Sequence, residues 1–332
     1  MTDVVSICIP VYNGEKYLHE CLHTVREQTY KYLDILVIDD GSTDHSVEII
    51  KKFRELDGRI RLLINDQNLG LVKNWQKCIE YANGVWIKFM FQDDTIKPSC
   101  VEEMVRESLK HQVSICICSR SFIIENNTSK SVENYFFKDV VKLEESYSDV
   151  KQFVPQEIAS LAKDKLFDNF IGEPITLLFK KDIIRRIGNY NSELIQLVDY
   201  EFALRACLNY NSVFIPKRLV SFRTHSQSAT SLKESTGIKG IKVMYVEPLI
   251  IFHEYLFNPC FKLLRASYGF LGLLKSAAVF YKFHDNSSQL YKSINKELLR
   301  KYKRLRIVQS VSALLTLKMI IKKMQFVCWY LL

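Results

Sequence analysis

Short apolar runs alternate with helix-like stripes of apolar residues through the first 120 residues, and this alternation constrains the fold more than any other feature. Val4–Ile9 and Leu33–Ile38 have the length and composition of buried strands, and Glu15–Gln28 between them repeats apolar residues every three or four positions. The pattern continues with strand-like runs at Ile60–Ile64, Val85–Phe91 and Val113–Ser119 and helix-like segments at Thr43–Leu56, Leu71–Ala82 and Pro98–His111. Such alternation predicts an α/β fold, with a mixed, mainly parallel sheet sandwiched between helices.

The chain after residue 120 divides near residue 235. Residues 120–170 are polar and irregular, strands and helices then return up to Arg223, and the pattern is helical after Gly240. The length of 332 residues also favours two domains. We therefore expect one domain at 1–235, with halves at 1–120 and 121–235, followed by a helical, basic C-terminal extension at 236–332.

The composition excludes several classes of protein. Hydrophobic residues make up 48% of the chain and charged residues 25%, which excludes a mostly disordered protein. The nine cysteines form no CxxC pair and lie in apolar runs, which indicates reduced, buried thiols and a cytoplasmic location. Asp3 and Pro10 bound a short apolar run at the start, a pattern typical of a strand and not of a secretory signal.

Positive charge is concentrated in the C-terminal extension. Pro259–Leu332 contains 14 basic and 2 acidic residues, a net charge of +12, whereas the preceding residues carry −3. Apolar segments at Ile307–Leu317 and Met324–Leu332 alternate with lysines, which favours a helix in the surface of an anionic membrane over a spanning one. We therefore expect a peripheral protein on the inner face of the cell membrane.

Two other interpretations of the extension stay open. It is also consistent with a helical subdomain that packs on the preceding domain, or with a segment that forms a homo-oligomer. Its cations are interleaved with aliphatic residues and form no recognisable nucleic-acid motif, so we expect no nucleic acid among the partners.

Polar and acidic residues follow three of the predicted strands. These strand ends carry Pro10–Gly14, Asp39–Asp44 and Gln92–Asp94. Because ligands of an open α/β sheet bind at the carboxyl ends of its strands, the three segments form the candidate site. Carboxylates gathered at one edge repel one another, and a hard divalent cation bound to a substrate diphosphate would offset that repulsion.

The ordered motifs PVYNG, VIDDGSTD, NDQNLGLVKNW and FQDD make residues 4–230 similar to the inverting family 2 glycosyltransferases of the GT-A fold. This resemblance implies a Rossmann-like sheet and a nucleotide-diphosphate sugar as the donor. It assigns Pro10, Tyr12 and Asn13 to the base pocket. Asp39 would accept hydrogen bonds from the uracil or the ribose, and Asp93 would complete the donor site.

The resemblance also implies Mn²⁺ or Mg²⁺ as a cofactor. Asp93 matches the metal-binding acid of the family, and Asp94 is expected to ligate the ion directly or through water. His225 matches a late motif whose histidine touches the metal or the diphosphate. Phe91 stands where the family has the first acid of its metal motif, so the ligand set departs from the family pattern.

The same resemblance assigns the groups that act on the acceptor. Asp199 matches the catalytic base, which removes the proton of the acceptor hydroxyl, although Val198 stands where a second acid usually precedes it. Glu173, in the segment Ile171–Pro174, matches the loop that binds the acceptor.

Together these assignments predict a metal-dependent inverting hexosyl- or N-acetylhexosaminyltransferase. Its donor would be a UDP-sugar, and its acceptor a saccharide or a lipid-linked saccharide in surface polysaccharide synthesis. Two alternatives remain: a non-catalytic relative that only binds sugar nucleotides, and a scaffold recruited through its basic tail. Asp93→Asn and Asp199→Asn separate catalysis from binding, because a binding protein needs only the first of the two carboxylates.

The individual residues also have ordinary explanations. Asp39, Asp93 and Asp199 are each consistent with a turn or a helix cap, and His225 with a structural histidine. The segment from His19 to His23 spells HExxH, the zinc pattern of metalloproteases. Both histidines lie off the apolar stripe of their predicted helix, and no third ligand is evident, so we do not expect a zinc protease.

Overall fold

The computed structural model describes residues 3–125, 142–163, 168–225 and 246–284, and the single positions Thr128, Arg304, Ile307, Ser310 and Val311. The chain divides into two compact units, Met1–Ser231 and Leu232–Leu332. Most of the basic tail after residue 284 lies outside the described residues, and so does the membrane-surface helix that the sequence predicts there.

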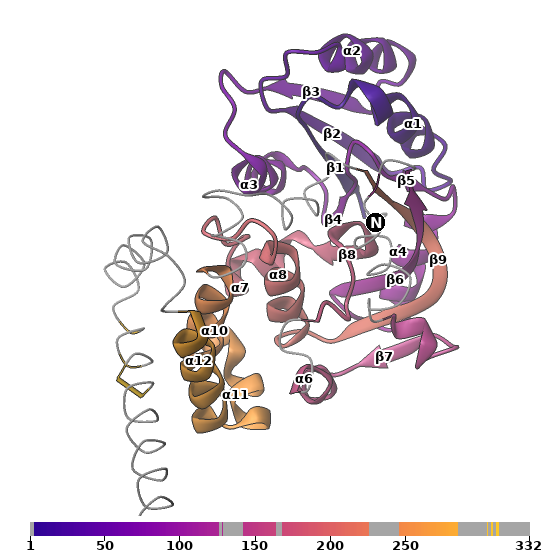
Figure 1. The fold of residues 1–332 in the computed structure, drawn as a ribbon. Helices are drawn as coiled ribbons and strands as arrows, with labels where there is room; N and C mark the ends of the chain where they lie inside the picture. The colour runs from indigo at the N-terminus through magenta and orange to yellow at the C-terminus, as the bar shows by residue number, and fades with distance from the viewer. Residues whose placement is uncertain are drawn as a thin grey trace, which may run out of the picture. The chain divides into compact units, whose positions relative to one another are not determined.

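A single sheet of nine strands forms the core of the first unit within the described ranges. The strands are β1 (Val5–Val11), β2 (Leu33–Asp39), β3 (Ile60–Ile64), β4 (Trp86–Phe89), β5 (Thr95–Ile96), β6 (Ile115–Ile124), β7 (Lys151–Phe153), β8 (Leu177–Lys180) and β9 (Ser212–Thr224). The neighbours β3, β2, β1 and β4 are parallel, and β6 is parallel to β9 (Figure 1). Strand β8 runs antiparallel to both β4 and β6 and so joins the two parallel groups.

Helices cover both faces of the parallel half of the sheet. The helices of this unit are α1 (Glu15–Arg26), α2 (Ser46–Leu56), α3 (Leu71–Tyr81), α4 (Cys100–Lys110), α6 (Pro155–Lys163), α7 (Ile184–Ile187) and α8 (Val198–Cys207). Leu18 of α1, Ile50 of α2 and Met104 of α4 pack into one core with alternate residues of β1 and β2. The thiol of Cys8, on the other face of β1, contacts the carbonyl oxygen of Cys78 in α3. The predicted α/β sandwich is confirmed.

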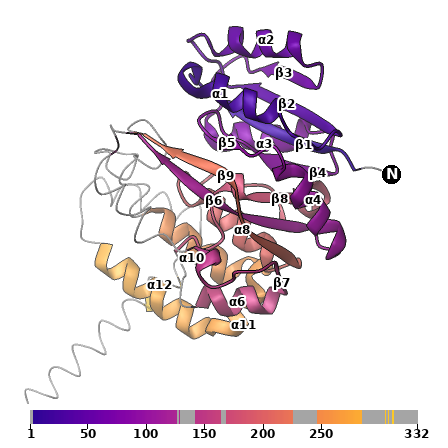
Figure 2. The same cartoon turned by 90° about the vertical axis from the view of Figure 1, so that its right-hand side faces the viewer.

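Strands β2 and β9 show how burial and register shape the sheet. All seven residues of β2 are buried, as expected for a strand with helices on both faces. Ser212–Thr224 form one long strand, β9, whose pairing with β6 shifts register after Cys118. Figure 2 shows β6 and β9 side by side along their length. The bulge lets Pro216 lie within a continuous strand, because a register shift frees the position of a ladder bond.

The second unit is helical where it is described. It contains α10 (Glu247–Phe257), α11 (Lys262–Tyr268) and α12 (Phe270–His284), as the apolar pattern after Gly240 predicts. The guanidinium of Arg265 donates to the carbonyl oxygens of Tyr255 and Asn258, which ties α11 to the end of α10. Among the described helices of the chain, none combines the length and hydropathy needed to cross a bilayer.

Candidate active site

The parallel strands bring the predicted acidic residues to one edge of the sheet. Val11, the last residue of β1, pairs with Asp39, the last residue of β2. Asp93 and Asp94 follow β4, which is the neighbour of β1 on its other side. Because all three strands run in the same direction, their carboxyl ends and the loops after them lie together.

The loop after β1 is fastened to the loop after β2. Asn13 has a positive φ of 49°, and its backbone N–H donates to the hydroxyl of Ser42 at 2.9 Å. The side-chain oxygen of Asn13 accepts from the N–H of Thr43 at 2.8 Å. Asparagine tolerates this left-handed conformation better than most residues. Asn13 therefore holds the two loops against each other.

A second fastening joins the loop after β1 to the loop after β4. The side-chain amide of Gln92 accepts from the N–H of Tyr12 at 2.9 Å and donates to its carbonyl oxygen at 3.1 Å. The ring of Tyr12 stays 48% exposed, and Pro10 is half-buried in β1. Gly14 makes room for this contact, because a Cβ there would lie 2.5 Å from Oε1 of Gln92. The motif PVYNG thus leaves one aromatic ring free at a rigid edge.

Asp39 and Asp40 differ in the number of hydrogen bonds that their carboxylates accept. Both are buried, and Oδ1 of Asp39 accepts from the N–H of Ser42 at 2.9 Å. Oδ2 of Asp39 has no hydrogen-bond donor among the described residues. The carboxylate of Asp40, by contrast, accepts from the side chain of Asn65 and from the N–H groups of Leu69 and Gly70. Buried carboxylate oxygens normally have a partner, so the free oxygen of Asp39 is suited to a ligand donor.

Asp93 and His225 meet although 132 residues separate them. Oδ2 of Asp93 lies 3.2 Å from Nε2 of His225, and their side chains are 20% and 12% exposed. A carboxylate oxygen and an imidazole nitrogen at this separation fit a divalent cation such as Mn²⁺. Within the described residues, no third His, Cys, Asp or Glu joins them to make a complete protein-only site. A cation there would need further ligands from a bound substrate.

Asp94, the next residue, has one carboxylate oxygen that is held by the protein. Its side chain is buried, and Oδ1 accepts from the N–H of Arg223 in β9 at 2.8 Å. Burial raises the pKa of Asp94 well above its ordinary value, and the charge of Asp93 adds to the rise. Oδ1 thus helps to fix β9 against the loop, whereas the buried Oδ2 has no hydrogen-bond donor among the described residues. The metal contact expected for Asp94 stays a prediction.

Phe91 belongs to a cluster of aromatic side chains. Its ring lies 4.9 Å from that of Trp75 in α3 and stacks on Phe89 at the end of β4, with 6.3 Å between centroids. Tyr190 packs against both Trp75 and Phe89. At position 91, where the family motif has an acid, this chain therefore has a ring that is part of a packed aromatic cluster.

Asp199 lies in the first turn of α8, beside this aromatic cluster. Its Oδ1 accepts from the N–H of Tyr200 at 2.7 Å, and its side chain is half-buried. Burial raises the pKa of the Tyr190 phenol well above its ordinary value, and the carboxylate of Asp199 is the next cause. Tyr190 packs against Phe89 at the end of β4 and against Phe202 of α8, the helix that carries Asp199.

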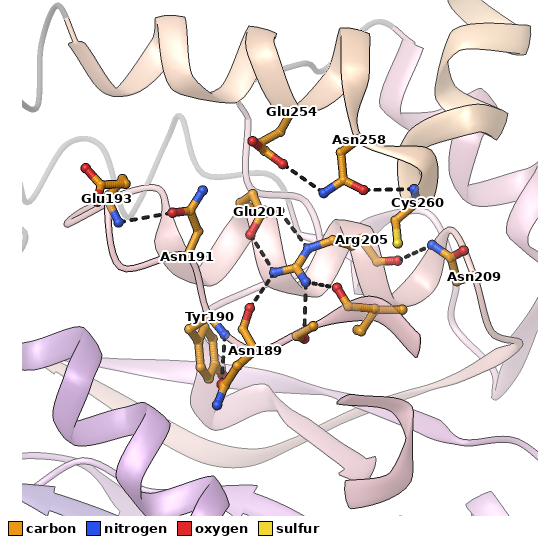
Figure 3. Close-up of polar contacts among 12 residues, drawn as sticks. Asn189, Tyr190, Asn191, Glu193, Glu201, Arg205, Asn209, Glu254, Asn258 and Cys260 are labelled. Atoms are coloured by element: carbon orange, nitrogen blue, oxygen red, sulfur yellow. Dashed lines mark hydrogen bonds and ion pairs between the residues drawn. The ribbon is translucent and has the colours of Figure 1, made fainter. Parts of the chain in front are cut away.

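Helix α8 is anchored by an ion pair that the sequence motifs do not indicate. The guanidinium of Arg205 donates to both oxygens of Glu201, at 2.7 and 2.9 Å, and both side chains are buried. It also donates to the carbonyl oxygens of Ile187, Gly188 and Asn189 (Figure 3). The available signal was the spacing of four residues between an acid and an arginine. This pair fixes the helix that carries Asp199.

Glu173 already has a partner. Its carboxylate is ion-paired with the buried guanidinium of Arg120 in β6. The preceding Gly172 has a φ of +113°, and a Cβ there would lie 2.8 Å from the hydroxyl of Thr176. The predicted acceptor residue thus sits on a tight turn with its charge balanced by the protein.

The chain resembles known glycosyltransferases in sequence. The sequence profile of glycosyl transferase family 2 matches residues 6–164. Glycosyltransferase GlyA of Streptococcus pneumoniae is 38% identical over 115 residues, which are 35% of this chain and 16% of GlyA. The chain therefore spans less than a fifth of that relative.

Two solved structures share the fold. S. aureus TarS 1–349, in complex with UDP-GlcNAc, has a TM-score of 0.62 at 18% identity, and the match covers 91% of this chain and 81% of TarS. Mannosyltransferase PcManGT of Pyrobaculum calidifontis, in complex with GDP-Man and Mn²⁺, has a TM-score of 0.56 at 15% identity, with 95% and 87% covered.

Proposed function

Since this chain belongs to glycosyl transferase family 2 through residues 6–164 and has the GT-A fold, we propose that it is a metal-dependent, inverting glycosyltransferase. It transfers a hexosyl or N-acetylhexosaminyl group from a UDP-sugar to an acceptor hydroxyl. The observation that carries this proposal is the meeting of Asp93 and His225 at the same sheet edge as the unpartnered oxygen of Asp39.

The loops after β1 and β2 hold the nucleoside. Tyr12 offers an exposed ring against the base, beside Pro10. Oδ2 of Asp39 accepts from an N–H of the uracil or an O–H of the ribose, which satisfies a buried charged acceptor. Asn13 supports this pocket by joining the two loops. The UDP-GlcNAc bound by TarS supports uridine as the nucleoside.

Asp93 and His225 would hold the cation, Mn²⁺ or Mg²⁺. The diphosphate of the donor supplies the further oxygen ligands that a magnesium- or manganese-type site requires. When bound, the cation neutralises negative charge on the departing diphosphate. The Mn²⁺ in the PcManGT complex supports this assignment.

Asp199 accepts the proton of the acceptor hydroxyl, whose oxygen attacks the anomeric carbon from the side opposite the diphosphate. Inversion follows, so an α-linked donor gives a β-glycoside. The anchored position of α8 supports this role, because a general base must be held at a fixed distance from its substrate. Glu173, oriented by Arg120, contributes to the acceptor side.

The acceptor is a saccharide or a lipid-linked saccharide, and the reaction belongs to surface polysaccharide synthesis. The catalytic domain is 1–235, and the helical extension 236–332 holds the protein on the inner face of the cell membrane. The net charge of +12 on Pro259–Leu332 supports an anionic lipid surface as the partner, with a homo-oligomer as the alternative.

A panel of sugar nucleotides tests the proposal. UDP-glucose, UDP-GlcNAc and GDP-mannose are each added with Mn²⁺ to the full chain, and thermal stabilisation and release of the nucleoside diphosphate are measured. A UDP-sugar should stabilise the protein and release UDP when simple sugars are supplied as acceptors. Absence of stabilisation by every donor would contradict the proposal and favour a scaffold.

Two substitutions separate catalysis from binding. Asp93→Asn should remove both stabilisation and turnover, because it removes the carboxylate of the cation site. Asp199→Asn should keep stabilisation and lower turnover by about 10²–10⁴-fold. Asp182→Asn, an exposed position in the segment before α7, is the matched control and should behave like the wild type. Turnover in Asp199→Asn equal to that of an active wild type would remove Asp199 as the base. A wild type that is stabilised by the donor but releases no UDP would favour the non-catalytic relative.

A further inference from the structure

Arg223 connects the loop that carries Asp93 to two other segments. Near the end of β9, its Nε donates to the carbonyl oxygen of Asp93 at 2.8 Å. Its Nη1 donates to Glu125 at 3.0 Å, and its Nη2 donates to Glu20 of α1 at 2.6 Å. Its side chain is only 8% exposed. One guanidinium thus joins the loop after β4, the segment after β6 and the helix after β1.

The same residue holds the neighbouring acid. The backbone N–H of Arg223 donates to Oδ1 of Asp94, while its side chain holds the backbone of Asp93. The two acidic residues are therefore held by one residue from two directions. His225, two positions further along the chain, then meets the carboxylate of Asp93.

Tyr17 of α1 completes the arrangement. The guanidinium of Arg223 lies 4.8 Å from the centroid of the Tyr17 ring, a cation–π contact. The ring of His225 lies 5.0 Å from the same ring, tilted by 39°. Tyr17 and Glu20 are three residues apart on α1 and so share one face of the helix. One helix face therefore touches both Arg223 and His225.

We propose that Arg223, together with Tyr17 and Glu20, is the positioning device of the cation site. The inference rests on the proposed function and adds residues to it. Arg223 fixes the backbone of Asp93, and Tyr17 fixes the ring of His225, so that the two ligand atoms stay near each other. Outer contacts of this kind orient the groups that bind a metal directly. Glu20, the acid of the HExxH segment, serves as a partner of Arg223.

The choice of arginine follows from the geometry. A planar guanidinium presents donors in fixed directions and reaches a carbonyl and two carboxylates at once. Lysine carries a single ammonium and cannot span these three partners from one position. Arg223→Lys should therefore keep the positive charge but lose part of the contacts to these three partners.

Metal affinity tests the proposal, and the full chain is used throughout. The dissociation constant of Mn²⁺ is measured by isothermal titration calorimetry at saturating UDP, and folding is followed by circular dichroism. Arg223→Gln should bind Mn²⁺ about 10- to 100-fold more weakly than the wild type. Arg223→Lys should recover only part of this loss. Mn²⁺ affinity equal to the wild type in folded Arg223→Gln would overturn the proposal.

A milder variant covers the case in which Arg223→Gln does not fold. Glu20→Lys places a cation beside Arg223 at a side chain that is 55% exposed, so the fold should tolerate it. Glu27→Lys is the matched control, because Glu27 follows the same helix and is 59% exposed. Glu20→Lys should weaken Mn²⁺ binding by about tenfold, and Glu27→Lys should leave it unchanged. Equal Mn²⁺ affinities in the two variants would overturn the proposal.

The wild type separates this inference from the function on which it rests. If the wild type binds no Mn²⁺ at saturating UDP, both the proposed function and the positioning role fail. If the wild type binds Mn²⁺ and folded variants bind it equally well, only the positioning role fails.

Discussion

Asp39 at the end of β2 and Glu201 in α8 are both buried carboxylates, yet their surroundings differ. The two oxygens of Glu201 accept from the guanidinium of Arg205, with which it forms a buried pair. Asp39 accepts one N–H from Ser42, and its second oxygen has no donor among the described residues. The difference separates a carboxylate that holds the fold from one that keeps an oxygen without a donor among the described residues, the oxygen that we propose contacts the nucleoside.

The same distinction applies to the other acidic residues. Asp40 receives donors from Asn65, Leu69 and Gly70, whereas Asp94, like Asp39, accepts one N–H and has a second oxygen without a donor among the described residues. Asp93 faces a histidine in the position where a cation and a diphosphate are proposed. We expect substitution of Asp40 to change stability, and substitutions of Asp39 and Asp93 to change ligand binding.

The largest effect is expected for Glu201→Gln. Removing one charge of a buried pair leaves Arg205 uncompensated, which costs about 3–5 kcal/mol. The free energy of unfolding, measured with urea, should fall by that amount. Glu157→Gln is the control, because the side chains of its pair with Lys151 are 43% and 37% exposed, and such a pair contributes below about 1 kcal/mol. Equal losses of unfolding free energy in the two variants would show that the buried pair of Glu201 holds the fold no more than the pair of Glu157 does.

A smaller effect is expected for Asp39→Asn. The substitution removes a charged acceptor that the nucleoside is proposed to use, a contact of about 1.5–3 kcal/mol. UDP should therefore bind about 10- to 100-fold more weakly by calorimetry, since each 1.4 kcal/mol is a factor of ten. The unfolding free energy should change little. A stable variant that binds UDP as the wild type does would show that the free oxygen has no ligand.

The smallest effect concerns Asp57, a paired carboxylate after α2. The guanidinium of Arg59 lowers the pKa of Asp57 below its ordinary value, although partial burial opposes this. A lowered pKa stabilises the fold above the unfolded value of ~3.9, and the contribution is lost as the pH falls below it. Asp57→Asn should cost up to about 1 kcal/mol at pH 7 and almost nothing at pH 2. A cost that does not change with pH would contradict the ion pair.

Local patterns predicted much of this molecule. The alternation of apolar runs gave the parallel strands and their helices, because each element buries its own stripe against the sheet. It also gave the strand-end acids, because parallel strands end at one edge. Asp39 and Asp93 could therefore be placed near each other from the sequence.

Contacts between distant segments could not be predicted in the same way. Arg120 reaches Glu173 across 53 positions, and Arg223 reaches Glu20 across 203. No local pattern marks which arginine meets which acid, since register and packing decide it. The buried position of Asp94 and the aromatic partners of Phe91 depend on the same long-range packing.

The binding of UDP with and without Mn²⁺ tests the central claim most directly. Calorimetry on the wild type should show that Mn²⁺ strengthens UDP binding, and that this gain disappears in Asp93→Asn. UDP affinity that is independent of Mn²⁺ in the wild type, or an equal gain in Asp93→Asn, would contradict the assignment of this sheet edge to a metal-bound diphosphate.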